Sequence, residues 1–378
     1  MRVLYFTRDY TPHDHRFLSA LAATPHAIYS LRLERRGMQR EDRPLPPAVT
    51  QVAWPGGQHP VSRWEGLRLI PALRRVLREV QPDVVHAGSV QTAALLTALS
   101  GYRPLVTMSW GSDLLKDADR DGRWRWATRY TLAHTSVLVG DCKAVEDKAA
   151  SFGFPRQRVV LFPWGVDLQR FCPGEEPDLR ARFGWRDDAF ILLSNRAWEP
   201  LYGVDGLARA FARAARQDDR LHLLLLGGGS QAQLLRKVLL DNGLLDRVHF
   251  GGQVSNIDLP RYYRAADLYL SASHSDGSSV SLMEALGCGR PALVSAIPGN
   301  VEWITPGAQG WLFPDGDEAA LEAGMLRAAK LETAKLNEMG RAARGLAEAR
   351  ADWSRNFPRL LDAYQLAIHL ERDKGGRQ

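Results

Sequence analysis

The amino-acid sequence predicts an α/β protein made of two doubly wound, Rossmann-like domains. Short apolar runs alternate with amphipathic helical segments along most of the 378 residues. The alternation restarts at Phe190, after a segment rich in Pro and Gly that begins near Pro163. Polar residues directly follow several apolar runs, as ligand groups do at the carboxyl ends of parallel strands. A chain of this length can bury two separate cores.

The composition narrows the class of protein. Hydrophobic residues make up 45% and charged residues 24%, which is typical of a soluble globular protein. No apolar run approaches the ~18 residues of a membrane span, and the first residues resemble a core strand, not a signal peptide. Cys142, Cys172 and Cys288 are scattered, which argues against a disulfide framework or a zinc site. We therefore expect a cytoplasmic protein without a metal.

The first half carries the excess of positive charge. Residues 1–160 contain 23 Lys and Arg against 15 Asp and Glu, whereas the rest of the chain has 26 against 28. Such a balance can steer an anionic acceptor or an anionic membrane surface towards the first half. The alternative is that the extra arginines only make the protein surface more soluble and bind no partner.

Polar residues in the first half suggest a ligand-binding region. A first strand at 2–6 is followed by His13, Asp14, His15 and Arg16, and then by an expected helix at 17–23. Residues at this position in an open α/β sheet can hold an acceptor hydroxyl or contact a phosphate. Ordinary surface residues are the alternative. The other segments expected here are strands at 28–33, 82–86, 105–109 and 136–141, a charged loop at 34–47 and a helix at 64–80.

Basic and aromatic residues are interleaved at 120–130, and the helix at 64–80 carries a row of arginines. Such segments can lie at a lipid headgroup layer or stack on nucleic-acid bases. No recognition module for RNA or DNA surrounds them, so a membrane or acceptor contact ranks above nucleic acid. Packed helices with a solvated arginine face are the alternative.

The second half is organised around residues 270–289, where a strand breaks into a Ser-, His-, Asp- and Gly-containing turn and then becomes a helix. A turn at a helix N-terminus, just past a strand, suits a phosphate. Asp276 and Glu284 are eight positions apart and can accept hydrogen bonds from the hydroxyls of a sugar and a ribose. A plain strand–turn–helix crossover with two solvated acids is the alternative.

The remaining expected segments are strands at 190–194, 222–226, 248–254, 266–271, 291–295 and 310–313, helices at 203–211, 259–266, 280–286, 318–330, 336–350 and 353–370, and a disordered tail from 372.

These motifs resemble those of the family 4 retaining glycosyltransferases. Asp276-Gly277 and Glu284-Ala285 lie in the register of that family's E-x7-E motif, with Asp in place of the first Glu. Residues 159–167 are similar to the family's interdomain hinge, and residues 310–313 to its G-x-L-f segment. The resemblance runs from the first strand to about Tyr364.

The resemblance implies a GT-B fold, in which two Rossmann-like domains face each other across a cleft. Residues 1–165 would form the acceptor-side domain, residues 166–352 the nucleotide-sugar domain, and the helix at 353–371 would return to the first. It also implies transfer of a sugar from a nucleotide diphosphate donor to a hydroxyl, with retention and without metal or cofactor. A UDP-sugar is favoured, with GDP-mannose next. The acceptor is either a lipid-linked precursor of an envelope glycan or glycolipid, or a soluble small molecule.

The same resemblance assigns site residues. Arg196 corresponds to an Arg that holds the diphosphate, whereas Tyr202 replaces a Lys there. Glu284 would bind the ribose and Asp276 the donor sugar. Further expected donor contacts are Gly229, Val254, Gly277, Ser278, Ser279, Val280 and Ser281. On the acceptor side, Trp110 replaces a His near the reacting carbon, and Asp113 joins residues 13–16 as a candidate.

Two other functions remain open at this point. A sugar-nucleotide epimerase can share the two-domain architecture, although the E-x7-E-like segment is not characteristic of such epimerases. A binding protein with a decayed site would be consistent with Tyr202, Trp110 and Asp276, which all depart from the family pattern.

Overall fold

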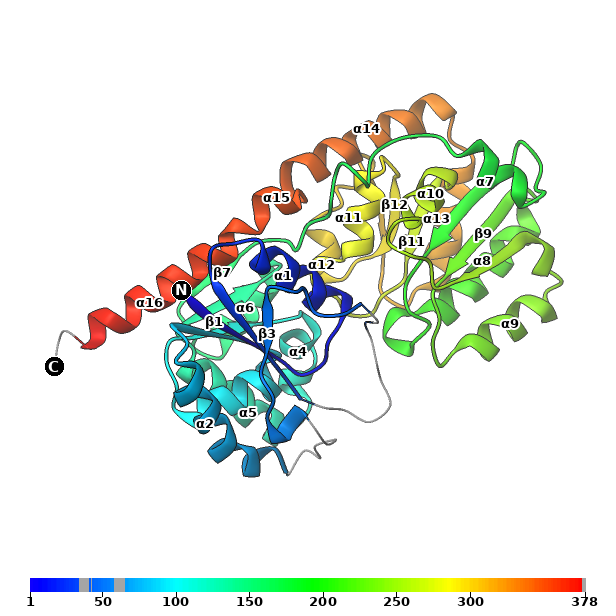
Figure 1. Cartoon of the computed structure of the whole chain (residues 1–378). Coiled ribbons are helices and arrows are strands. Elements are labelled where there is room, and N and C mark those ends of the chain that lie inside the picture. Colours follow the sequence, from blue (N-terminus) through cyan, green and yellow to red (C-terminus); the bar gives the residue numbers. More distant parts are fainter. Residues whose placement is uncertain (34–40, 42, 58–64, 376–378) are drawn as a thin grey trace. The chain divides into compact units, whose positions relative to one another are not determined.

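The computed structural model describes residues 1–33, 41, 43–57 and 65–375 (Figure 1). Its internal contacts divide the chain into two units. Unit 1 comprises Met1–Phe162 and Phe357–Gln378, and unit 2 comprises Pro163–Asn356. Each unit is built on one parallel β-sheet, so the predicted α/β class is confirmed. Most of the predicted loop at 34–47 and the start of the predicted helix at 64 lie outside the described residues.

Unit 1 contains a seven-stranded parallel sheet in the order β3-β2-β1-β4-β5-β6-β7. The central strands are buried along nearly their whole length, as expected for a parallel sheet that is covered on both faces. The strands are β1 (Arg2–Thr7), β2 (Ala27–Arg32), β3 (Val49–Gln51), β4 (Val84–Gly88), β5 (Leu105–Met108), β6 (Val137–Gly140) and β7 (Val159–Leu161). The helices are α1 (Pro12–Ala22), α2 (Ile70–Val80), α3 (Leu95–Ser100), α4 (Ser112–Leu115), α5 (Gly122–His134), α6 (Lys143–Ser151) and α16 (Pro358–Gly375).

Helix α1 begins earlier than predicted. Thr11 caps it, Pro12 occupies its first turn, and Asp14 completes a capping box with Thr11. The predicted residues 13–16 therefore form the first turn of the helix and do not precede it. A Thr three residues before an Asp was the sequence signal for this start.

The predicted C-terminal helix at 353–370 is interrupted. Helix α15 (Trp353–Asn356) stops just before Pro358, and α16 begins at that proline. Proline lacks the backbone N–H of a continuing helix and its ring clashes with the preceding turn, so it begins a new helix instead. Helix α16 packs on β6 and β5 within unit 1. The predicted disordered tail is wrong over its first part, because α16 extends to Gly375.

Unit 2 contains a six-stranded parallel sheet in the order β10-β9-β8-β11-β12-β13. The strands are β8 (Phe190–Ser194), β9 (Leu221–Leu226), β10 (Val248–Gly252), β11 (Leu268–Ser271), β12 (Ala292–Ser295) and β13 (Gly310–Phe313). The helices, besides α15, are α7 (Pro177–Arg182), α8 (Val204–Gln217), α9 (Ala232–Asp241), α10 (Leu259–Ala265), α11 (Val280–Gly287), α12 (Pro298–Val301), α13 (Glu318–Ala329) and α14 (Thr333–Arg350).

Helices cover both faces of the unit 2 sheet. Helices α8 and α13 contribute Leu207 and Met325 to one apolar cluster, and α11 and α14 contribute Leu282 and Ala347 to the other. The strand order reverses direction between the neighbours β8 and β11. In open α/β sheets, ligands bind outside the carboxyl ends of the strands at such a switch point.

Candidate active site

The predicted donor residues meet at the switch point of unit 2. Arg196 and Tyr202 follow β8, and Asp276 follows β11. Glu284 lies on α11, the helix that leads away from the β11 loop. Residues far apart in the sequence thus lie at one edge of one sheet.

Arg196 is the centre of this cluster. Its Nη2 lies 2.6 Å from Oδ2 of Asp276, and its Nη1 donates hydrogen bonds of 3.0 Å to Oγ of Ser279 and to Oγ of Ser281. Its Nε is buried and makes no hydrogen bond with any described residue. Burial opposes the guanidinium charge, yet the pKa of Arg196 is raised because Asp276 and neighbouring groups favour the cation.

Tyr202 stacks against Arg196 where the family pattern has a lysine. The guanidinium carbon lies 4.3 Å from the centre of the Tyr202 ring, a cation–π contact. The next residue, Gly203, has a φ of +58°, and a Cβ there would lie 2.2 Å from the carbonyl oxygen of Ala272. A glycine is therefore required for the β8 loop to approach the β11 loop this closely.

The start of α11 presents three buried serines. Ser279 caps the helix and accepts a hydrogen bond from the N–H of Leu282. Ser278 accepts one from Nε1 of Trp303, and Ser281 pairs with the hydroxyl of Tyr269 at 2.7 Å. The first N–H groups of a helix lack partners within the helix and carry partial positive charge. The hydroxyls of Ser279 and Ser281 thus hold Arg196 beside a helix end that attracts anions.

Glu284 is buried, with only 6% of its surface exposed, but it is not isolated. The hydroxyl of Tyr263 on α10 lies 2.8 Å from its Oε2. Tyr263 was not predicted as a site residue, because a tyrosine in an apolar helical segment is typical of an ordinary core residue.

Glu199 is a second residue that the sequence did not single out. Its carboxylate accepts hydrogen bonds from the backbone N–H and the hydroxyl of Ser230, which ties the β8 loop to the glycine loop after β9. Gly229 has a φ of +158°, and a Cβ there would lie 2.4 Å from the carbonyl oxygen of Trp198. Val254 follows β10 and is half-buried against the apolar cluster of α11. Gly229 and Val254 therefore border the same strand edge as Arg196.

In unit 1, the structure brings His13 and Trp110 together. Their rings are stacked with centres 5.8 Å apart, and Trp110 also contacts Phe17. His15 is half-buried, lies near Oγ of Ser19 and has a pKa lowered mainly by burial. Arg16 is half-buried on the same helix. The start of α1 and the loop after β5 thus lie side by side.

Asp14 and Asp113 differ from the prediction, because both carboxylates are turned into unit 1. Asp14 accepts hydrogen bonds from Tyr5 and Thr11, and burial raises its pKa to about 6. Asp113 accepts them from the N–H groups of Val90, Trp110 and Leu114 and from Oγ of Ser109, and burial raises its pKa. These bonds fix the two loops, so neither carboxylate faces outwards as an acceptor contact.

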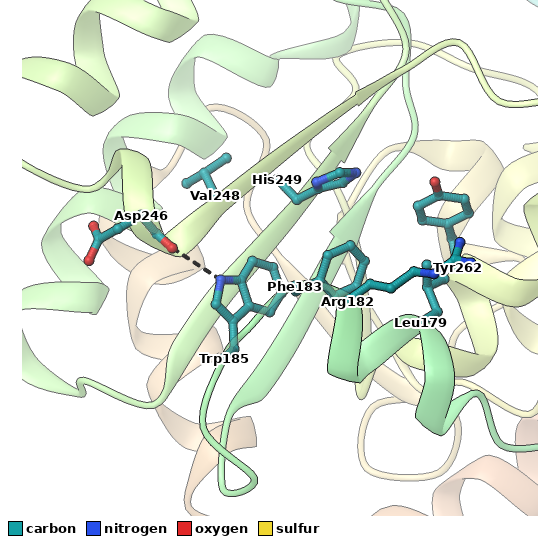
Figure 2. Close-up of a pocket in the computed structure, with 8 residues that line it drawn as sticks. All are labelled: Leu179, Arg182, Phe183, Trp185, Asp246, Val248, His249 and Tyr262. Carbon is teal, nitrogen blue, oxygen red and sulfur yellow. Dashed lines mark hydrogen bonds between the residues drawn. The ribbon is translucent and has the colours of Figure 1, made fainter.

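Unit 2 also has a cavity of about 330 Å³ that contains none of the predicted residues (Figure 2). It is lined by α7, the start of β10 and α10, with the rings of Phe183, His249 and Tyr262 around it. The indole N–H of Trp185 is held by the carbonyl of Asp246. The cavity lies towards the amino end of β10, whereas the donor residues follow the carboxyl ends of the strands. Among the described residues, no cluster of His, Cys, Asp and Glu could hold a metal ion.

Comparisons with known proteins agree with this arrangement. Residues 175–346 match the family model described as glycosyl transferases group 1, and residues 13–170 match glycosyltransferase family 4. A D-inositol 3-phosphate glycosyltransferase of Catenulispora acidiphila is 30% identical over 78% of this chain and 73% of its own length. The chain belongs to the family 4 glycosyltransferases. The predicted family and enzyme class are confirmed.

Further relatives and solved structures support the family and the fold. The D-inositol 3-phosphate glycosyltransferase of Geodermatophilus obscurus is 32% identical, and the match spans 57% of this chain and about half (49%) of that protein. HepE from Anabaena, solved with UDP and glucose, has a TM-score of 0.78 at 18% identity over 97% of this chain and 99% of its own. Sucrose-phosphate synthase from Thermosynechococcus elongatus has a TM-score of 0.78 at 19% identity over 97% and 98%. The glycosyltransferase thus has the two-sheet GT-B fold class that was predicted.

Proposed function

We propose that this glycosyltransferase moves a sugar from a UDP-sugar to a hydroxyl acceptor with retention of anomeric configuration and without a metal ion. The single observation that carries the proposal is the cluster of Arg196, Asp276 and Glu284 at the switch point of unit 2. A nucleotide diphosphate needs a cation for its phosphates and acceptors for its ribose hydroxyls, and the cluster offers both. UDP in the solved HepE structures favours uridine over guanosine.

In the proposed reaction, the donor diphosphate replaces Asp276 as the partner of Arg196. Asp276 then accepts hydrogen bonds from the donor sugar, and Glu284 accepts them from the ribose. The bond between the anomeric carbon and the diphosphate oxygen breaks, while the bond to the acceptor oxygen forms on the same face of the sugar. The acceptor proton passes to an oxygen of the leaving diphosphate, so no protein nucleophile is required. Arg196 and the N-terminus of α11 stabilise the developing negative charge.

Nucleotide binding provides the first test. We expect UDP to raise the melting temperature more than GDP, ADP or TDP, because a ligand that binds only the folded state stabilises it by mass action. Arg196→Ala should abolish the shift and reduce kcat/KM at least about 100-fold, since it removes a charge-assisted contact in a buried site. Activity that survives EDTA would support a reaction without a metal ion, and an unchanged anomeric configuration in the product would support retention. A chain that binds UDP without releasing it from any UDP-sugar would instead be a decayed binding protein.

The acceptor is proposed to be lipid-linked, with the protein in the cytoplasm and unit 1 contacting an anionic membrane. Helix α5 exposes Arg123, Arg125 and Arg129, and Trp126 on the same helix is 55% exposed. Basic and aromatic side chains together suit an anionic headgroup layer. Among the described residues, no helix is long and apolar enough to cross a membrane. Sedimentation with phosphatidylglycerol vesicles but not with phosphatidylcholine vesicles, weakened by Trp126→Ala, is the expected result; no sedimentation would favour a soluble acceptor.

A further inference from the structure

Glu284 is the end of a chain of three hydrogen-bonded polar side chains that begins inside the core of unit 2. The amide Nδ2 of Asn195 lies 2.8 Å from the hydroxyl of Tyr263, and this hydroxyl lies 2.8 Å from Oε2 of Glu284. Tyr263 is fully buried on α10, behind the site, where its ring packs against Phe171 and Tyr269. The tyrosine therefore approaches the carboxylate from the protein side.

The chain of hydrogen bonds has a direction. Nδ2 of Asn195 can only donate, so the Tyr263 oxygen accepts there and keeps its single proton for another partner. Two acceptors compete for that proton, Oε2 of Glu284 at 2.8 Å and the carbonyl of Ser281 at 3.0 Å. The carboxylate is the closer one and forms the stronger, charge-assisted bond. Burial, followed by the nearby Glu284, raises the pKa of Tyr263 well above its ordinary value, so the phenol keeps its proton.

We propose that Tyr263 is a positioning residue that gives the donor site its preference for ribonucleotides over 2′-deoxyribonucleotides. This inference rests on the proposed role of Glu284 as the ribose contact. The hydrogen bond from Tyr263 to Oε2 helps to set the orientation in which the carboxylate meets the ribose hydroxyls. Removal of this hydrogen bond changes the orientation of the carboxylate, so that a ribose with two hydroxyls loses much of its advantage over one that lacks the 2′-hydroxyl. A site built to pair with a hydroxyl rejects analogues without it only when its own groups are held in place.

The neighbouring tyrosine offers a matched control. Tyr262 lies on the same helix but points to the cavity of Figure 2, where its ring lies 6.4 Å from that of His249. Its hydroxyl makes no hydrogen bond with the other residues that line this cavity. Tyr263→Phe and Tyr262→Phe thus remove the same atom from adjacent positions, one bound to Glu284 and one remote from it.

Isothermal titration with UDP and with 2′-deoxy-UDP tests the inference on the full chain. We expect the wild type and Tyr262→Phe to bind UDP at least about tenfold more tightly than 2′-deoxy-UDP. The reason is that loss of one hydrogen bond to a charged group weakens binding by about this factor. In Tyr263→Phe the ratio should fall to about threefold or less, mainly through weaker UDP binding. A general structural defect would weaken both ligands alike and leave the ratio unchanged, which would overturn the proposal.

A double variant tests whether Tyr263 acts through Glu284. Glu284→Gln should also reduce the UDP to 2′-deoxy-UDP ratio, and adding Tyr263→Phe should not reduce it further. A further fall in the ratio would show that Tyr263 contacts the ribose by another route and would contradict the inference. If Tyr263→Phe does not fold, Asn195→Ala removes the donor that orients the hydroxyl and should lower the ratio in the same direction. Failure of the wild type to bind UDP would refute the proposed function, whereas binding with an unchanged ratio in Tyr263→Phe would refute only this inference.

Discussion

At the scale of single residues, Arg196 has a counter-charge within its own site. Asp276 accepts its hydrogen bond at 2.6 Å, and Tyr202 covers one face of the guanidinium. A tyrosine supplies only a neutral donor where the family pattern supplies a second cation. The proposed donor site therefore offers a diphosphate less positive charge than the usual family pattern provides.

Restoring that cation should strengthen donor binding. We expect Tyr202→Lys to tighten UDP binding by about tenfold at low salt, because the ammonium adds a charge-assisted contact to the diphosphate. The gain should shrink as ionic strength rises. Tyr202→Phe is the control and should change binding by no more than about twofold, since its ring can still cover Arg196. Titration of the three proteins with UDP at two salt concentrations makes the comparison; equal or weaker binding by Tyr202→Lys would mean that position 202 does not face the diphosphate.

At the scale of elements, α16 is joined to the unit 1 sheet through a buried histidine. His86 on β4 lies with Nδ1 2.6 Å from the hydroxyl of Tyr364 on α16, and with Nε2 3.3 Å from Sδ of Met108. Burial lowers the pKa of His86 to about 3. The imidazole is therefore neutral in the folded protein at both pH 7 and pH 5.

This burial makes unit 1 sensitive to acid. In the unfolded chain His86 takes up a proton near the ordinary histidine pKa of 6.5, whereas the folded protein does so only near 3, so stability falls as pH drops through this window. Asp14 has the opposite effect on stability, because burial raises its pKa to about 6. Between pH 6 and pH 3.8 its carboxyl is protonated in the folded protein but ionised in the unfolded chain, so stability rises as the pH drops through this range. Replacing His86 separates the two effects, because Asp14 is common to wild type and variant.

We expect the stability advantage of the wild type over His86→Asn to shrink by roughly 2 kcal/mol between pH 7 and pH 5. The reason is that, below the pKa of the unfolded histidine, each step of one in pH favours the protonated unfolded chain by about 1.4 kcal/mol. Urea unfolding at both pH values, followed by a probe in unit 1, measures the difference. His369→Asn, at an exposed position on α16, is the control for replacing a histidine outside the core. An advantage that stays constant with pH would show that His86 titrates equally in both states.

The elements that the sequence predicted best are the buried strands. The strand at 190–194 coincides with the structure, because a parallel strand covered on both faces appears as an unbroken apolar run. The edge strand at 310–313 also coincides, although its two central residues are only partly buried. The start of α1 was less visible, since its first turn is polar and faces outwards in part. The break before Pro358 was missed because the apolar periodicity continues on both sides of it.

The candidate site was predictable as far as strand ends and motif spacing determine it. Arg196, Asp276 and Glu284 were expected at one sheet edge, and they are found there. The burial of Asp113 was not predictable, since it depends on Val90, a residue 23 positions away that supplies one of its hydrogen bonds. The contact between Tyr263 and Glu284 likewise depends on how α10 packs against α11.

At the scale of the whole molecule, each unit has a core of its own. Apolar clusters around Leu4 and Leu138 lie in unit 1, and those around Leu223 and Leu193 lie in unit 2. The proposed donor residues from Arg196 to Glu284 all belong to unit 2. Chains with separate cores commonly depart from two-state unfolding, so the two units need not melt together.

We therefore expect two overlapping transitions in scanning calorimetry and a selective effect of the donor nucleotide. UDP at about 100 times its Kd should stabilise unit 2 by about 2.7 kcal/mol, because it binds only the folded form of that unit. His86→Asn identifies the unit 1 transition by lowering it alone. Glu284→Gln should reduce the UDP-induced rise of the other transition while leaving the unit 1 transition in place. If UDP raised the transition marked by His86→Asn as strongly as the other, the nucleotide would draw a substantial part of its binding energy from unit 1, and a donor site confined to unit 2 would be wrong.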